Sequence, residues 1–203
     1  MRKMIRRIGI CLCISSLVWV GGIIGNRERL NENLIRMHVV AASDSREDQD
    51  LKLLVRDAVT ESLQEAMADI RDTEEAKAYL QENLDRIREI ANGVLTSNGC
   101  QDTAVVTLCK EAFDVRHYDT FSLPSGIYDA LRITIGEGQG HNWWCVVFPT
   151  LCIPATSDGF SDVAAGAGFP DALTAALEGE AGYEIRFFLL EALGELEIML
   201  QGG

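Results

Sequence analysis

The sequence predicts an α+β domain in which two long helices pack on a small, mostly antiparallel sheet. Three observations favour this fold class. A short β-branched segment comes first, two long amphipathic segments follow it, and three segments with alternating apolar and polar side chains come last. The predicted order is therefore β-α-α-β-β-β. Helices on one face of a sheet are the simplest two-layer arrangement of these elements, and we expect this domain to span residues 30–153.

The first strand and the first helix are predicted on either side of a short polar run. Residues 34–41 (LIRMHVVA) are short and rich in β-branched side chains, which is typical of a strand. Residues 43–45 (SDS) are side chains that often cap a helix N-terminus. Apolar residues then recur at spacings of three and four, which predicts an amphipathic helix over 47–70.

A second helix and three strands complete the predicted domain. The helix begins at Asp72, a good N-cap residue, and ends near 98–99 (NG). Strands are predicted over 103–113, 127–135 and 141–148, and we expect them to form a meander. A loop over 116–126 lies between the first two of these strands.

A glycine-rich segment, 136–140 (GEGQG), lies between the last two strands. It has no lysine and opens no helix, so it does not match a phosphate-binding loop. We expect instead a turn whose glycines adopt positive φ.

The C-terminal part differs in composition from the domain. Residues 154–182 are rich in glycine and alanine and contain two prolines, which predicts a flexible linker. Residues 183–203 are predicted to form an amphipathic helix with a wide apolar face. That face could return to the core of the domain, or it could dock to a partner or a membrane surface.

The N-terminal 25 residues are typical of an export signal or a membrane anchor. Four cations, at positions 2, 3, 6 and 7, precede an uncharged apolar run of 17 residues over 8–24. Such a run is at the lower limit for spanning a bilayer and also fits a signal peptide. The positive flank should stay inside the cell, so the rest of the chain should cross the membrane. No A-x-A cleavage site precedes Asn26, and both a cleaved signal and an uncleaved anchor remain open.

The charge of the chain excludes one large class of function. The formal net charge is −13 and the isoelectric point is near 4.6. Such a surface repels the phosphate backbone of nucleic acids, so we expect no nucleic-acid partner.

The sequence contains no established catalytic or metal-binding motif. The three histidines, His38, His117 and His141, lack the H-x-x-x-H or C-x-x-C spacing of a zinc site, and we expect neither metal nor cofactor. His38 and His141 could nevertheless meet near Asp44 and form a catalytic pair or hold a metal. An ordinary surface or core position is the alternative for each histidine.

Four cysteines follow the export segment. Cys100 and Cys109 flank one predicted strand, and Cys145 and Cys152 flank another. An exported chain permits disulfides, and a bond between Cys145 and Cys152 is possible if Pro149 turns the chain back.

Three stretches together resemble the stage II sporulation protein R family of endospore-forming bacteria. They are residues 35–63 (IRMHVVAASDSREDQDLKLLVRDAVTESL), 123–135 (LPSGIYDALRITI) and 136–153 (GEGQGHNWWCVVFPTLCI). The resemblance implies a protein that is made in the forespore and exported into the space between the forespore and mother-cell membranes. There it would activate a membrane-embedded aspartic protease, which removes the pro-sequence of sporulation sigma factor E. The resemblance therefore implies a secreted or anchored intercellular signal and not an enzyme.

A protein signal needs an exposed, rigid patch, and polar and aromatic residues gather near the predicted strand ends. The hypothesis assigns partner binding to His38, Ser43, Asp44, Asp48, Lys52, Arg56, Arg132, Glu137, His141, Asn142, Trp143 and Trp144. Trp143 and Trp144 should point to opposite faces of their strand. The alternative is that Arg56 and Arg132 pair with Asp57 or Glu137 and only brace the fold.

Two other classes of function remain alternatives. One is an exported cell-wall hydrolase or metal-dependent enzyme that uses His38, Asp44 and His141. The other is a module that inhibits a protease by inserting the 116–126 loop into its active site.

Overall fold

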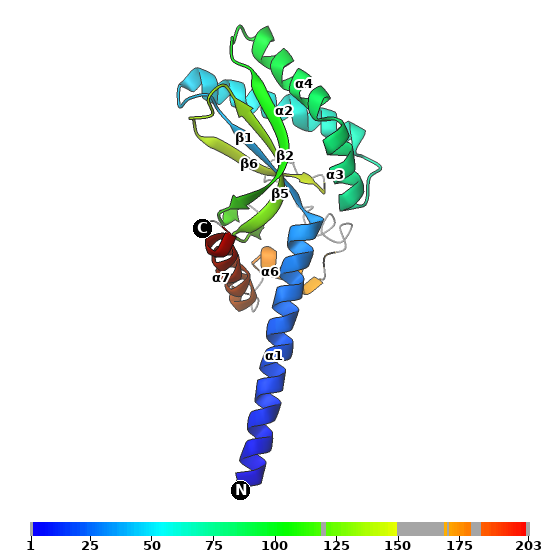
Figure 1. Cartoon of the computed structure of the whole chain (residues 1–203), viewed down its shortest axis with the longest axis vertical. Helices are drawn as coiled ribbons and strands as arrows, with labels where there is room; N and C mark the ends of the chain where they lie inside the picture. The colour runs from blue at the N-terminus through cyan, green and yellow to red at the C-terminus, as the bar shows by residue number, and fades with distance from the viewer. Residues whose placement is uncertain (1, 119–120, 150–168, 170, 180–183, 202–203) are drawn as a thin grey trace.

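A long N-terminal helix leads into an α+β body in this computed structural model, which describes residues 2–118, 121–149, 169, 171–179 and 184–201 (Figure 1). The described elements are α1 (Arg2–Asn33), β1 (Ile35–Val40), α2 (Arg46–Ala66), α3 (Thr73–Glu82), α4 (Leu84–Ser97), β2 (Ala104–Phe113), β3 (Arg116–His117), β4 (Ser122–Leu123), β5 (Gly126–Ile135), β6 (Asn142–Phe148), α6 (Asp171–Leu177) and α7 (Glu184–Gln201). The predicted fold class is confirmed.

The four long strands form a mixed sheet in the order β2-β5-β1-β6. β1 pairs with β5 in parallel and with β6 antiparallel, and β2 pairs antiparallel with β5. The prediction of a meander is wrong, because β1 lies between β5 and β6. All six residues of β1 are buried, as expected for a central strand covered on both faces.

One face of the sheet is covered by α2, α3 and α4, and the contact between them is apolar (Figure 1). Side chains of alternate strand residues, such as Met37 and Val39 in β1 and Leu131 and Ile133 in β5, are inaccessible to solvent. They pack against the buried stripes of the helices, for example Val55 and Val59 of α2. We call this side of the sheet the helical face.

The helices begin where the sequence predicts, but the second helix is divided in two. The Ser45 hydroxyl accepts a hydrogen bond from the backbone N–H of Asp48, and the Asp72 carboxylate accepts two at the start of α3. α3 ends at Glu82, and the side-chain amide of its C-cap residue Asn83 donates to the carbonyl of Tyr79 at 2.8 Å. This side-chain bond competes with the helical ladder, and α4 starts immediately afterwards.

The glycine-rich segment passes over the end of β1 on its way from β5 to β6. Its backbone N–H groups at Gln139 and Gly140 donate to the carbonyls of Ala42 and Ala41 at 3.1 and 2.9 Å. A Cβ atom at Gly140 would lie 2.2 Å from the carbonyl oxygen of Ser43, so only glycine permits this close approach. The expected positive φ is present at Gly136 and Gly138.

The opposite face of the sheet packs against α1, α6 and α7, and we call it the terminal face. Its apolar cluster joins Ile23 and Leu30 of α1, Phe113 of β2, Leu173 of α6 and Leu190 of α7. Helix α6 lies inside the segment that the sequence predicts as a linker, and its Leu173 is fully buried. The remainder of that predicted linker is mostly outside the described residues.

α1 is one continuous helix that combines an exposed apolar part with a part of the core. Residues 6–33 are long and apolar enough to cross a membrane, in line with a signal or anchor segment. Ile23 and Leu30 belong to the terminal-face cluster, and Arg27 is also buried. The last turns of α1 are therefore part of the folded body, which the sequence prediction did not include.

The remaining predictions concern the loop and the cysteines. The 116–126 loop contains the short β3–β4 pair, in which Arg116 faces Leu123. Cys100 and Cys109 are free thiols. The possible disulfide between Cys145 and Cys152 stays a prediction, because Cys152 lies outside the described residues.

Candidate functional site

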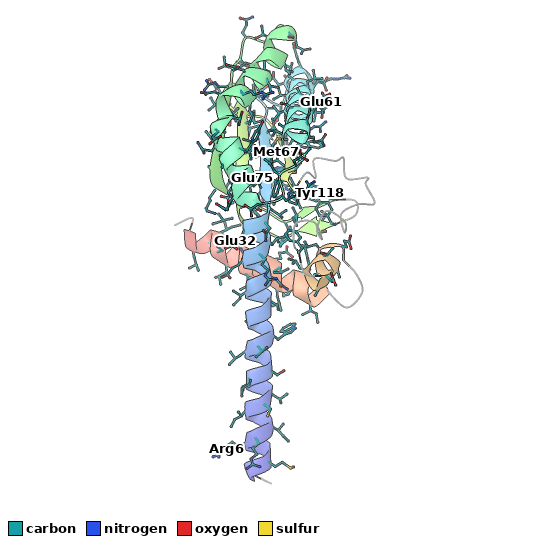
Figure 2. The ribbon with its side chains drawn as sticks, turned by 90° about the vertical axis from the view of Figure 1, so that its right-hand side faces the viewer. Arg6, Glu32, Glu61, Met67, Glu75 and Tyr118 are labelled. Atoms are coloured by element: carbon teal, nitrogen blue, oxygen red, sulfur yellow. The ribbon has the colours of Figure 1, made fainter. Side chains whose placement is uncertain are left out.

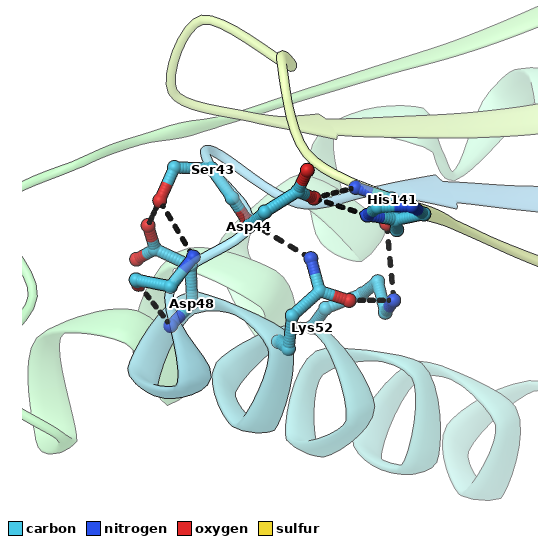
Figure 3. A network of polar contacts seen from close by, with 7 residues as sticks. Ser43, Asp44, Asp48, Lys52 and His141 are labelled. Atoms are coloured by element: carbon cyan, nitrogen blue, oxygen red, sulfur yellow. Dashed lines mark hydrogen bonds and ion pairs between the residues drawn. The ribbon is translucent and has the colours of Figure 1, made fainter.

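A network of polar contacts joins the end of β1, the first turns of α2 and the start of β6 (Figure 3). The Asp44 carboxylate accepts hydrogen bonds from the backbone N–H of His141, at 2.6 Å, and contacts the Nδ1 of the same residue. Lys52 Nζ donates to the carbonyl of His141 at 3.0 Å and to Gln49 at 2.5 Å. Gln49 in turn donates to the carbonyl of Ser43 at 2.9 Å. We call these residues the strand-end network.

The local sequence explains why this network forms. The Ser43 hydroxyl lies between the carboxylate of Asp48 and the backbone N–H of Ser45, which begins the helix. This arrangement fixes the turn between β1 and α2. Lys52 then lies one helical turn beyond Asp48 and reaches the carbonyl of His141, the residue before β6.

The two charged groups at the centre of the network have shifted pKa values. The hydrogen bonds from His141 lower the pKa of the Asp44 carboxyl below its ordinary value of 3.8. Burial lowers the pKa of the Lys52 ammonium, and the nearby charge of Arg56 lowers it further. Lys52 is almost fully buried, whereas the side chains of Asp44 and His141 are exposed. The network therefore exposes the Asp44 carboxylate and the His141 imidazole to solvent, and the Lys52 ammonium lies buried beneath them.

Beside the network, an aromatic side chain is held by an arginine. The guanidinium carbon of Arg56 lies 4.1 Å from the centre of the Trp143 ring, a cation–π contact. Arg56 also pairs with Asp57 at 2.6 Å, as the bracing alternative predicted. Trp143 remains 36% exposed, so it is fixed in orientation but still accessible. We call Asp44, Arg56, His141, Asn142 and Trp143 the distal patch.

A second polar cluster lies on the terminal face of the sheet. His38 Nδ1 lies 2.9 Å from the Glu111 carboxylate, and its ring stacks on Trp144 with 3.7 Å between centroids. Arg132 donates to the same Glu111 oxygen at 3.0 Å. His38 is 3% exposed and lies inside the body, whereas the Arg132 side chain is 42% exposed at the edge of the cluster. We call it the buried polar cluster.

Arg36 lies two residues before His38 on the same face and is completely buried. Its guanidinium carbon is 4.0 Å from the centre of the Phe113 ring, and one Nη donates to the Tyr118 hydroxyl at 3.3 Å. Its Nε and other Nη have no hydrogen-bond partner among the residues that the structure describes. The aromatic rings thus provide most of the favourable contacts of this charge.

The structure divides the predicted binding residues between two places. The larger group lies around the strand-end network and consists of Ser43, Asp44, Asp48, Lys52, Arg56, His141, Asn142 and Trp143. Glu137 is exposed on the neighbouring glycine-rich loop. His38, Arg132 and Trp144 lie on the terminal face. Trp143 and Trp144 do point to opposite faces, since β6 pairs them with the adjacent residues Val39 and His38 of β1.

The catalytic or metal-binding trio His38, Asp44 and His141 does not converge. His38 contacts Glu111 inside the body, whereas His141 contacts Asp44 at the end of the sheet. Within the part of the chain that the structure describes, no three His, Cys, Asp or Glu residues are grouped to hold a metal ion. The alternative in which Arg132 pairs with Asp57 or Glu137 is wrong, because Arg132 pairs with Glu111.

The sequence analysis missed Arg36, Glu111 and Phe113. Glu111 and Phe113 alternate with outward residues at the end of β2. This period of two in the sequence could have shown that both side chains point to the same face of the sheet. It could not reveal a cluster, because β2 and β1 are separated in the sheet by β5, and the strand order was not predicted.

Comparison with known proteins identifies relatives of this chain. The family model of stage II sporulation protein R matches residues 31–158. The stage II sporulation protein R of Bacillus subtilis (strain 168) is 38% identical over 128 residues, which are 63% of this chain and 57% of the relative. The chain thus matches a little over half the length of that relative. No solved structure matches. Helices α6 and α7 lie beyond the matched residues.

Proposed function

Because the chain belongs to the stage II sporulation protein R family, we propose that it is an exported signal that activates a membrane-embedded aspartic protease. Its role lies in sporulation. In the proposed reaction the protease cleaves the precursor of the mother-cell sigma factor E, and this chain supplies no catalytic group. The proposed location is the space between the forespore and mother-cell membranes, with the N-terminal segment as signal or anchor.

The position of the distal patch is the observation that supports this proposal. β1 continues upward from α1, and the distal patch follows its far end (Figure 1). Six residues of strand at about 3.3 Å each separate that end from α1 by about 20 Å. A domain anchored through α1 would therefore direct this patch away from its own membrane. A protease in the opposite membrane would be approached by this end of the molecule.

The composition of the distal patch also suits protein recognition. Trp143 is a large apolar side chain whose orientation is fixed by Arg56, and tryptophan and arginine are frequent at interface hot spots. Asp44 and His141 add polar groups that contact each other, and Asp44 is also held by the backbone N–H of His141. Such a rigid patch loses little side-chain freedom on binding.

The test is to produce the full chain together with the protease and the sigma precursor in cells that lack all three. We expect precursor cleavage to require both the chain and the catalytic aspartates of the protease. Trp143→Ala should slow cleavage about tenfold or more, if Trp143 contributes as a hot spot. Leu54→Ala is the matched control, because Leu54 is an exposed apolar residue of α2 outside the patch.

The thermal unfolding of each variant separates recognition from folding. Trp143→Ala protein that melts as the control does but fails to activate supports the patch. Full activation by folded Trp143→Ala would remove the patch from the proposal. Absence of cleavage with folded wild-type chain would contradict the activator function, and metal analysis and a wall-lysis assay would then test the exported enzyme.

A further inference from the structure

Helix α7 carries apolar side chains on its outward face as well as on its inward face. Its exposed apolar residues recur at helical spacing along the whole helix: Ile185, Phe188, Ala192, Leu196, Met199 and Leu200. Phe188 is 64% exposed and Met199 is 73% exposed. A continuous outward stripe of this kind is unusual for a helix that faces only water.

The orientation of this stripe is fixed by the contacts on the opposite side of α7. A Cβ atom at Gly194 would lie 1.8 Å from the carbonyl oxygen of Ser125, so the helix backbone touches the loop before β5. Leu190 is buried, and its carbonyl accepts a hydrogen bond from Arg27 of α1 at 2.9 Å. Arg27 also pairs with Glu197. The stripe therefore points away from the body.

The place of α7 along α1 connects the stripe with the apolar segment of that helix. Figure 2 shows α7 running across α1 below Glu32, between the body and the part of α1 that ends near Arg6. Among the side chains of α1 that the structure describes, the first to join the core is Ile23, and those before it are exposed. The uncharged run from Ile8 to Ile24 is about 26 Å long at 1.5 Å per residue, close to the ~30 Å hydrocarbon core of a bilayer.

We propose that α7 lies on the surface of the membrane that α1 spans, with its outward apolar stripe in the boundary between headgroups and acyl chains. If the run from Ile8 to Ile24 occupies the hydrocarbon, α7 is held at the level where α1 leaves it. An amphipathic helix at this level inserts its apolar face about 5–10 Å into the boundary. α1 and α7 then attach the body to the membrane at two places.

The charge of α7 indicates which lipid it would prefer. The helix contains Glu184, Glu191, Glu195 and Glu197 but only one basic residue, Arg186. A helix that binds anionic lipid electrostatically is instead rich in lysine and arginine. We therefore expect the stripe to bind through apolar contact, in zwitterionic lipid and without need of anionic lipid.

This inference rests on α1 spanning the membrane, which is part of the proposed function, and the two are tested separately. The full chain is reconstituted in phosphatidylcholine vesicles, and alkaline extraction shows whether it remains integrated. All variants carry Trp19→Phe, because Trp19 lies in the apolar segment of α1. Leu196→Trp then places a fluorophore on the stripe, and Leu54→Trp places one on exposed α2 as the matched control.

The readout is quenching by brominated lipid and by aqueous acrylamide, and the signal of the Trp19→Phe parent is subtracted because Trp143 and Trp144 fluoresce in every variant. We expect brominated lipid to quench the tryptophan at 196 at least about twofold more than that at 54, and acrylamide to show the reverse. Adding phosphatidylglycerol should not increase the lipid quenching.

Three results would overturn the inference. One is equal lipid quenching at 196 and 54 in a chain that stays integrated. Another is protection of the tryptophan at 196 from acrylamide that increases with protein concentration while brominated lipid does not quench it. That result would show that a second copy of the chain covers the stripe. Lipid quenching that requires phosphatidylglycerol would contradict the apolar mode of binding. Release of the chain by alkali would instead refute the span, and with it the premise.

Discussion

The two faces of the sheet are built from the same strands but contain different kinds of core. On the helical face, residues such as Met37 and Val39 of β1 belong to a large apolar cluster with side chains of α2 to α4. On the terminal face, the alternate residues Arg36 and His38 are buried among aromatic rings and one carboxylate. Neighbouring residues of β1 thus point into two different cores, and only the core of the terminal face combines its apolar cluster with a buried arginine and histidine.

The difference indicates that the helical face contributes most of the stability, whereas the polar contacts of the terminal face fix the arrangement of the strands. The contacts of the apolar cluster on the helical face each gain free energy from apolar burial. A buried charge costs free energy unless it is hydrogen-bonded, so the terminal face gains less net stability from each group. The stacked rings and the His38–Glu111–Arg132 contacts instead fix how β1, β2 and β6 face one another.

The largest expected effect comes from the helical face. Leu131→Ala removes a fully buried side chain of β5, and the cavity and lost burial should destabilise the protein by about 3–4 kcal/mol. Urea unfolding measures this change. Leu54→Ala, on the exposed side of α2, should change the free energy of unfolding by less than about 0.5 kcal/mol. A small effect at Leu131 would show that the helical face does not dominate stability.

A charge on the terminal face should have a smaller effect. Glu111→Leu removes the carboxylate that contacts His38 and Arg132, and we expect a loss of about 2–3 kcal/mol because both partners lose a charged hydrogen bond. Glu111→Gln retains an acceptor and should lose less. If Glu111→Leu were as stable as wild type by urea unfolding, the cluster would make no net contribution to folding.

Alkaline pH should affect the terminal face selectively through Tyr128. Burial raises the pKa of Tyr128 from 10.0 to about 12, because the neutral phenol is fully enclosed and donates to the carbonyl of Pro124 at 2.8 Å. Below pH 10 the phenol is neutral in both states, and its contribution to stability is fully present. As the pH rises from 10 towards 12 the unfolded chain loses this proton first, so the contribution is lost.

The measurement is urea unfolding of wild type and Tyr128→Phe between pH 8 and 11.5. The advantage of wild type over the variant should fall by about 2 kcal/mol across this range, at ~1.4 kcal/mol per pKa unit. A constant difference would show that Tyr128 ionises as easily in the folded protein as in the unfolded chain.

The smallest expected effect belongs to a charge outside both faces, at the exposed end of the sheet. The pKa of Asp44 is lower in the folded protein than in the unfolded chain. Its ionised carboxylate therefore contributes to folding stability above the unfolded pKa, and this stability is lost as the pH falls through the folded pKa. Asp44→Asn should therefore lose less stability than wild type on acidification from pH 5 to 2. Thermal melting at each pH checks the direction, and a larger acid loss in the variant would contradict it.

The sequence by itself determined the elements and their class. Periodicity located every long strand and the α2 and α7 helices, since one buried face imposes a period of two or of 3.6 residues on each element. Ser45 and Asp72 marked two helix starts because capping is a local interaction. The motifs around residues 35–63 and 123–153 indicated the family, and the family match confirms it.

Only the tertiary structure decided how these elements combine. The position of β1 between β5 and β6 depends on contacts between residues about 100 positions apart, which no local pattern encodes. That strand order separated His38 from His141, brought Glu111 to His38 and placed Trp143 against Arg56. It also decided which side of α7 is buried, because the helix is apolar on both sides and only its contacts with Ser125 and Arg27 select one.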